Sequence, residues 1–219
     1  SPDGAWVAIL GDGVSNRGVS NKLTLVPTGA GTARTIDLPL EIRRLNPLGR
    51  ERESFHVEFS TDNRRLMIPS DGAESPAARI YVHDLQDGWT KPVTPEGVPG
   101  PAAFSPDGRF VAVIEATQLV VYSVDDGTRR ELRGGPEPAL VARWSSDGRS
   151  LLLIERLGTT ARVLRRDIET GTREFLREIR VSDPAGVVFL DVWASPDAQA
   201  YVYSAGRRTM NLFVVEGLR

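Results

Sequence analysis

The stretch Phe104-Ser105-Pro106-Asp107-Gly108-Arg109-Phe110-Val111-Ala112-Val113-Ile114 joins a tight turn to an apolar run, and its pattern recurs along the chain. Proline fixes the backbone angle φ near −65°, aspartate can accept a hydrogen bond from the backbone ahead of it, and glycine tolerates a positive φ. A tetrapeptide of this kind between two apolar runs predicts a β-hairpin.

Five copies of this turn lie along the 219 residues, and their serines are 59, 45, 40 and 50 residues apart. The copies are Ser1-Pro2-Asp3-Gly4, Ser60-Thr61-Asp62-Asn63, Ser105-Pro106-Asp107-Gly108, Ser145-Ser146-Asp147-Gly148 and Ser195-Pro196-Asp197-Ala198. Each is followed by a short apolar stretch, at 6–10, 66–68, 110–114, 151–154 and 201–203. An internal repeat of this period has to be explained by the fold.

A second turn signal follows each copy at a similar distance, at Gly29, Gly88, Gly127, Gly171 and Gly217. A β-rich segment precedes each of these glycines, at 22–26, 79–84, 119–124, 162–168 and 211–215. Each period therefore predicts four strands. We call them A, before the first turn, B, after it, C, before the second glycine, and D, after that glycine.

Several strands are apolar on both faces, as at 110–114, so a sheet must pack against another sheet on each side. Four-stranded units of roughly 40–50 residues with two buried faces are typical of β-propeller blades. A helical solenoid is excluded because no window keeps apolar residues at three-and-four spacing over three turns. A β-sandwich gives no reason to repeat one turn phrase five times. The sequence predicts an all-β fold, a β-propeller of four-stranded blades.

The expected blades are incomplete at both ends of the chain. The first lacks strand A and the last lacks strand D, which gives 18 strands for about five blades. We expect residues 1–219 to form one propeller domain that is part of a longer chain, with one to three further blades before Ser1. Exposed strand edges at both ends would otherwise remain.

Composition excludes several classes of protein. The chain has 27 Lys+Arg against 29 Asp+Glu, a formal net charge of −2 and no cysteine. It therefore offers no disulfide, no thiolate nucleophile and no general attraction to nucleic acid or anionic membrane. The apolar runs are far shorter than the ~18 residues of a membrane span. Lys22 and Lys91 are the only lysines, which suits a GC-rich bacterial genome.

No catalytic phrase is present in the sequence. It has no Gly-x-Ser-x-Gly elbow and no phosphate-binding Gly-x4-Gly-Lys loop. His56 and His83 stand apart, and we expect a channel-lining residue and a strand residue with a local hydrogen bond, not metal ligands. The repeat aspartates, Asp3, Asp62, Asp107, Asp147 and Asp197, are explained by turn chemistry, as are Gly108 and Gly148. We expect no catalytic residue, no cofactor and no metal.

The repeat, read in Phe104-Ser105-Pro106-Asp107-Gly108-Arg109 and Val111-Ala112-Val113, resembles that of TolB-type, WD-repeat-like bacterial propellers over the whole chain. The stretches 181–187, 195–204 and 211–218 are similar to the carboxyl end of certain bacterial membrane-anchored serine/threonine kinases, and Thr94-Pro95-Glu96-Gly97 fits the same group. That likeness implies a sensor propeller outside the cytoplasm, in the periplasm or beyond. The chain contains no kinase motif, so the likeness assigns kinase activity to none of its residues.

The long loops define the expected ligand face. The B–C and D–A loops of a propeller share one face, and here they cover 11–21, 38–54 and 70–78. Long-loop residues Arg43, Arg44, Arg52, His56, Arg207 and Arg208 are the candidate ligand contacts, suited to an anionic partner such as a carboxylate-bearing peptide. A solvated loop with alternating charges is the other interpretation.

The expected function is therefore a non-catalytic binding or sensor module for a protein, a peptide or a small ligand. Nucleic-acid partners and direct membrane insertion are not expected, and the oligomeric state is left open. Two alternatives stay open: the propeller domain of a prolyl-oligopeptidase-type serine peptidase, and a TolB-like periplasmic assembly protein.

Overall fold

The computed structural model describes residues 1–10, 19–43, 57–72, 78–98 and 101–208, which contain 17 strands. The strands follow one another in five antiparallel units. The first contains β1 (Trp6–Leu10), β2 (Val19–Pro27) and β3 (Arg34–Arg43); the second β4 (Glu58–Phe59), β5 (Arg65–Gly72), β6 (Ala78–Asp84) and β7 (Thr90–Pro92); the third β8 (Ala102–Phe104), β9 (Phe110–Glu115), β10 (Gln118–Ser123) and β11 (Arg129–Glu131); the fourth β12 (Leu140–Trp144), β13 (Ser150–Leu157), β14 (Thr160–Asp167) and β15 (Arg173–Arg180); the fifth β16 (Val187–Ala194) and β17 (Tyr201–Arg207).

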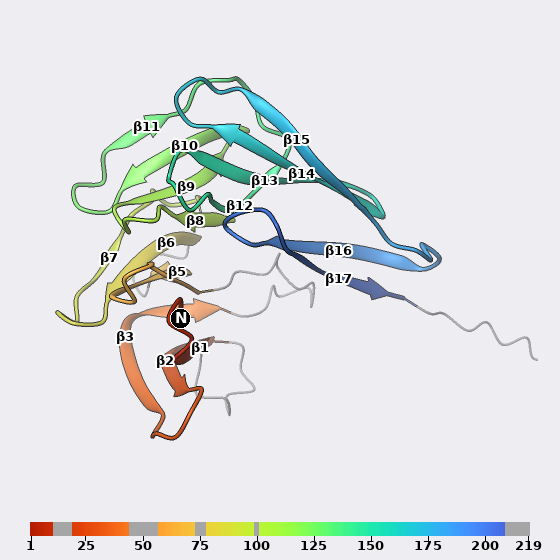
Figure 1. Ribbon diagram of the computed structural model, residues 1–219. Helices are drawn as coiled ribbons and strands as arrows, with labels where there is room; N and C mark the ends of the chain where they lie inside the picture. The colour runs from red at the N-terminus through yellow and green to blue at the C-terminus, as the bar shows by residue number, and fades with distance from the viewer. Residues whose placement is uncertain (11–18, 44–56, 73–77, 99–100, 209–219) are drawn as a thin grey trace, which may run out of the picture.

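These units are the blades of a β-propeller, and the predicted fold is confirmed. Figure 1 shows them following one another around a common centre, from β1–β3 in red and orange to β16 and β17 in blue. The innermost strands β4, β8, β12 and β16 contact one another in series. The expected outer strand at 211–215 lies outside the described residues.

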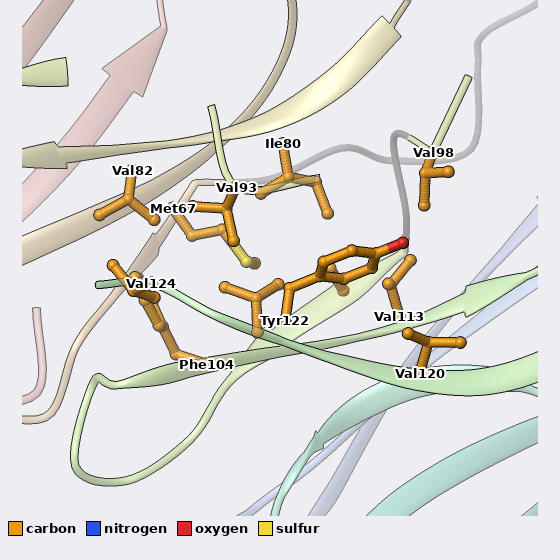
Figure 2. Packing of buried hydrophobic residues seen from close by; sticks show 12 residues of the cluster. Met67, Ile80, Val82, Val93, Val98, Phe104, Val113, Val120, Tyr122 and Val124 are labelled. Atoms are coloured by element: carbon orange, nitrogen blue, oxygen red, sulfur yellow. The ribbon is translucent and has the colours of Figure 1, made fainter. Parts of the chain in front are cut away.

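The hydrophobic core is divided between the blades. Four clusters of buried side chains lie one between each pair of successive blades. In the third blade, Val111 and Val113 face the second blade, whereas Ala112 between them faces the fourth. Figure 2 shows the cluster between the second and third blades, where Met67 and Ile80 meet Tyr122. The period-two alternation of each strand thus supplies two cores, as two-sided apolar strands require.

The repeated turn has the same geometry in every blade. Its fourth residue has a φ of 71° at Gly4, 59° at Asn63, 66° at Gly108, 69° at Gly148 and 58° at Ala198. In each turn the aspartate carboxylate accepts the backbone N–H two residues ahead, and the serine hydroxyl donates to that carboxylate. The turn phrase is therefore a closed local network that fixes each inner hairpin.

The first two blades are joined, which the repeat did not indicate. Strand β3 pairs with β5 through Leu40–Gly72 and Glu41–Asp71, giving one seven-stranded sheet. Within 57–72 the inner strand β4 has two described residues, which pair with Met67 and Leu66 of β5. The far end of β5 therefore has a free edge, and the ten-residue β3 occupies it.

The strands are also longer than expected at the long-loop face. Strand β3 reaches Arg43, so 38–43 is strand and not loop, and β2 already begins at Val19. Strand β5 continues to Gly72, and β17 ends at Arg207. The strand ends were misplaced because hydrogen bonding to a neighbouring strand extends them into polar sequence. Among the described residues no helix is long and apolar enough to cross a membrane.

Candidate functional site: a cavity on the propeller axis

A cavity of about 600 Å³ lies at the centre of the described blades. Every blade contributes to its wall, mostly through the inner strand and the turn that follows it. The lining residues are Ser1 and Pro2; Val57, Glu58, Phe59 and Thr61; Phe104 and Pro106; Ala142, Arg143, Trp144, Ser145 and Ser146; and Trp193, Ala194 and Pro196. Its size is that of an ordinary small-ligand site.

Glu58 is the acidic side chain of this wall. Its Oε2 accepts the backbone N–H of Phe104 at 3.0 Å, which ties the second blade to the third. Burial raises the pKa of Glu58 to about 7, although the hydrogen bond from Phe104 and the positive charge of Arg143 both lower it. Near neutral pH the protonated and ionised forms of this carboxyl group are therefore both populated.

Two neighbouring residues of β12 also form hydrogen bonds from their side chains to the backbone of an adjacent blade, one on each side of the fourth blade. The Nη1 of Arg143 donates to the carbonyl of Ala194 at 3.1 Å, in the fifth blade. The indole Nε1 of Trp144 donates to the carbonyl of Ala103 at 3.1 Å, in the third blade. Inner strands that do not pair with one another are thus bridged by side chains, and these bridges hold Glu58 and Arg143 in fixed positions.

Aromatic residues of four blades belong to the wall, although Phe104 and Trp144 pack mainly in the cores between blades. Phe59, Phe104, Trp144 and Trp193 come from four different inner strands. Trp144 is 5% exposed, whereas Trp193 is 40% exposed and so offers ring surface to a ligand. The combination of apolar walls with a few fixed polar groups is typical of a site that binds a small molecule or a peptide segment.

The turns of the repeat form the rim of the cavity. Thr61 Oγ1 donates to the carbonyl of Pro106, and Arg65 Nη1 donates to the carbonyl of Gly108 at 3.1 Å, so successive turns are bonded together. The hydroxyl of Ser145 and the N–H of Arg149 hold the pKa of Asp147 below its usual value. The rim aspartates therefore serve their own turns.

The candidate contacts on the long-loop face are only partly described. Arg44, Arg52 and His56 lie outside the described residues, and Arg43 is the last residue of β3. Arg207 ends β17 and pairs with Asp183, whose carboxylate lies 2.5 Å from its Nη1. Arg208 is exposed and donates its backbone N–H to the carbonyl of Gly186. The role of these six residues as ligand contacts stays a prediction.

His83 lies on β6 and is 3% exposed, and its Nδ1 is 2.9 Å from Thr90 Oγ1 on β7. This is the local hydrogen bond that was expected. In the part of the chain that the structure describes, no group of three or more His, Cys, Asp or Glu side chains could hold a metal ion.

The sequence analysis did not identify Glu58 and Arg143 as cavity residues, although one position of the repeat points to them. The residue two positions before each repeat serine is Glu58, Ala103, Arg143 or Trp193 in the second to fifth blades. The phrase after this position is nearly constant, while the position itself changes its chemistry completely. Glu58, Arg143 and Trp193 line the cavity, whereas Ala103 is fully buried between the third and fourth blades, so this signal finds the cavity in three of the four blades.

Comparison with known proteins supports the fold. No protein-family model and no curated protein matches the sequence. Among solved structures, TolB from Acinetobacter baumannii is similar over 94% of this chain and 52% of its own, with a TM-score of 0.59 and 19% identity. The tricorn protease is similar over 92% of this chain and 23% of its own, with a TM-score of 0.56 and 11% identity.

A chain of the nidogen/laminin complex is also similar, over 86% of this chain and 76% of its own, with a TM-score of 0.52 and 13% identity. At these identities the likeness shows a shared TolB-like propeller fold. The chain spans about half the length of the Acinetobacter TolB chain.

Proposed function

We propose that this propeller is a binding module that holds a peptide ligand in its axial cavity. The observation that carries the proposal is the shared wall. All five blades contribute to one cavity, and its wall combines aromatic residues with an anchored carboxyl group and an anchored guanidinium group. Rigid inner strands position these groups without a mobile loop, so little ordering is needed on binding.

The comparisons support a binding role in general terms. The similar folds include TolB, a protease and a chain from a complex of nidogen with laminin, so one architecture serves several functions. A protein or a peptide is therefore a suitable class of partner. An enzyme that uses this chain as a non-catalytic domain is the alternative.

The test uses a pool of dipeptides that includes each dipeptide with free termini and with both termini capped. The pool is dialysed to equilibrium against the protein, and mass spectrometry identifies the dipeptides that the protein retains. Ser146 is exposed and lines the cavity, so Ser146→Trp should block the entrance. Gln199 is exposed on the turn of the fifth blade and is not a lining residue, so Gln199→Trp is the matched control.

We expect members of the pool to be retained by the native protein and by Gln199→Trp, and to be lost with Ser146→Trp. Thermal melts of both variants should match that of the native protein. Retention of nothing by the native protein, or equal retention by Ser146→Trp, would contradict the axial site.

We also propose that the module acts as the sensor part of a membrane-anchored serine/threonine kinase outside the cytoplasm. The likeness of 181–187, 195–204 and 211–218 to such proteins favours this role. Sequencing of the complete reading frame tests it: a kinase domain and a membrane helix before the propeller would support it. A hydrolase domain with a Gly-x-Ser-x-Gly elbow would support the peptidase alternative instead.

A further inference from the structure

Two opposite charges share the axial cavity without pairing. Glu58 and Arg143 are the charged side chains among its described lining residues, and no direct ion pair joins these two described residues. They are near enough for Arg143 to act on the Glu58 carboxyl group through its charge. Each is anchored on the neighbouring blade, which fixes the separation between them.

Interior charges elsewhere in this fold are paired directly. The fully buried Arg166 and Glu137 are joined by a 2.7 Å bond between Nη1 and Oε2. The buried Asp84 lies 2.8 Å from Arg64 Nε. Desolvated charges are costly unless they are paired. Glu58 and Arg143 are instead partly exposed and lie apart, so they differ from the structural pairs of the same chain.

Both groups keep hydrogen-bonding capacity beyond their anchoring bonds. Glu58 uses Oε2 for the N–H of Phe104, and its Oε1 has no hydrogen bond to a described residue. Arg143 uses Nη1 for the carbonyl of Ala194, while its guanidinium carries further N–H groups. An acceptor on one side of the cavity and donors on the other are thus available to a ligand.

Charge complementarity then decides which ligand suits the cavity. A simple cation would meet Arg143 as well as Glu58, and a simple anion would meet Glu58 as well as Arg143. A ligand that carries both charges matches each wall group with its opposite and leaves neither unpaired.

We propose that the axial cavity selects a zwitterionic ligand, a free amino acid or a very short peptide, whose ammonium group binds Glu58 and whose carboxylate binds Arg143. The proposal rests on the axial binding function stated above and specifies its ligand. Phe59 and Trp193 line the same cavity and suit an apolar side chain on that ligand.

The experiment measures dissociation constants by calorimetry for one dipeptide, phenylalanylglycine, in four forms: free, N-acetylated, C-amidated, and capped at both ends. For the native 219-residue chain we expect each single cap to weaken binding at least tenfold. This comparison needs no variant, so a folding defect cannot obscure it.

Two substitutions then assign each terminus to its residue. Glu58→Gln should remove the preference for a free amino group while keeping the preference for a free carboxylate, and Arg143→Gln should do the reverse. The capped dipeptide should bind these variants and the native protein with similar, weak affinity.

The outcomes separate this inference from the function on which it rests. Equal binding of the free and doubly capped forms, abolished by Ser146→Trp, would overturn the zwitterion proposal and leave the axial site standing. Absence of binding for all four forms would overturn the zwitterion proposal, and the pooled dialysis then decides the axial site separately.

Discussion

Each inner hairpin of the propeller needs one turn residue with a positive φ. Five such residues lie at equivalent places, and in two blades they are Asn63 and Ala198, not glycine. The left-handed conformation costs an ordinary residue about 1–2 kcal/mol, and asparagine tolerates it better than most. A β-branched residue tolerates it least.

We therefore expect Gly108→Val to destabilise the protein by about 1–3 kcal/mol. Gly108 has a φ of 66°, and an added Cβ would also lie 3.1 Å from the Cβ of Ser60 on the neighbouring turn. Urea denaturation should show the loss. Gly108→Asn is the control. It adds the same Cβ, but asparagine adopts this φ more easily than valine does, so the loss of stability should be smaller. A thermal melt of Gly108→Val within a degree of the native protein would refute the turn assignment.

The partly buried acid of the cavity should make stability depend on pH. Burial raises the pKa of Glu58 from 4.5 to about 7, so the folded state binds the proton more tightly than the unfolded state does. The resulting stabilisation is fully present below pH 4.5, falls as the pH rises toward 7 and is absent above it. The total is about 3 kcal/mol.

The measurement is the free energy of unfolding of the native protein minus that of Glu58→Gln, from pH 4 to pH 8. Contributions of other titrating groups cancel in this difference. A difference that stays flat across this range would show that the carboxyl group is not effectively desolvated.

At the scale of the element, side chains connect inner strands that share no backbone ladder. Glu58 bridges β4 to β8, Trp144 bridges β12 to β8, and Arg143 bridges β12 to β16. A hydrogen bond of this kind contributes about 0.5–1.5 kcal/mol, so packing of the side chains must supply most of the adhesion between blades.

Trp144 tests this division between packing and hydrogen bonding. It packs in the cluster between the third and fourth blades. Trp144→Ala should cost ~3–5 kcal/mol because it leaves a large cavity. Trp144→Phe keeps a ring and loses mainly the bond to Ala103, so it should cost about 1–2 kcal/mol. Urea denaturation compares the two variants, and equal losses would show that packing by the indole is not the main contribution.

At the scale of the whole molecule, blades stack around an axis and each buries the faces of its neighbours. Both faces of a blade are apolar. In the third blade the adjacent residues Val111 and Ala112 pack against different neighbouring blades. This arrangement leaves the two rims for binding. The turns that border the cavity lie at one rim, and strands β3 and β17 end at the other, at Arg43 and Arg207.

The loop-face hypothesis stays a separate prediction about that second rim. Replacing Arg43, Arg44 and Arg52 together by Ala should leave the thermal melt nearly unchanged. It should also weaken binding of an anionic peptide and flatten its dependence on salt, since several exposed charges act together. Calorimetry with an acidic peptide at two salt concentrations provides the measurement, and unchanged binding by the triple variant would exclude the loop face.

Much of the fold could be predicted because the repeat is local. The turn phrase and the run Phe110–Ile114 need only neighbouring residues to define a hairpin, and recurrence of the hairpin defines a blade. The joined first sheet could not be predicted, because the pairing of Leu40 with Gly72 depends on how short β4 is. The strand ends at Arg43 and Arg207 could not be predicted either, because hydrogen bonding to a neighbouring strand extends a strand into polar sequence.

Less of the candidate site than of the fold could be predicted from the sequence. The sequence determined that the chain forms blades, that the repeat aspartates serve turns and that His83 has a local partner, since each follows from residues close together in the chain. Only the tertiary structure decided that Glu58 and Arg143 share one cavity. They are 85 positions apart on different blades, and the arrangement of those blades around an axis brings both to its wall and desolvates the acid.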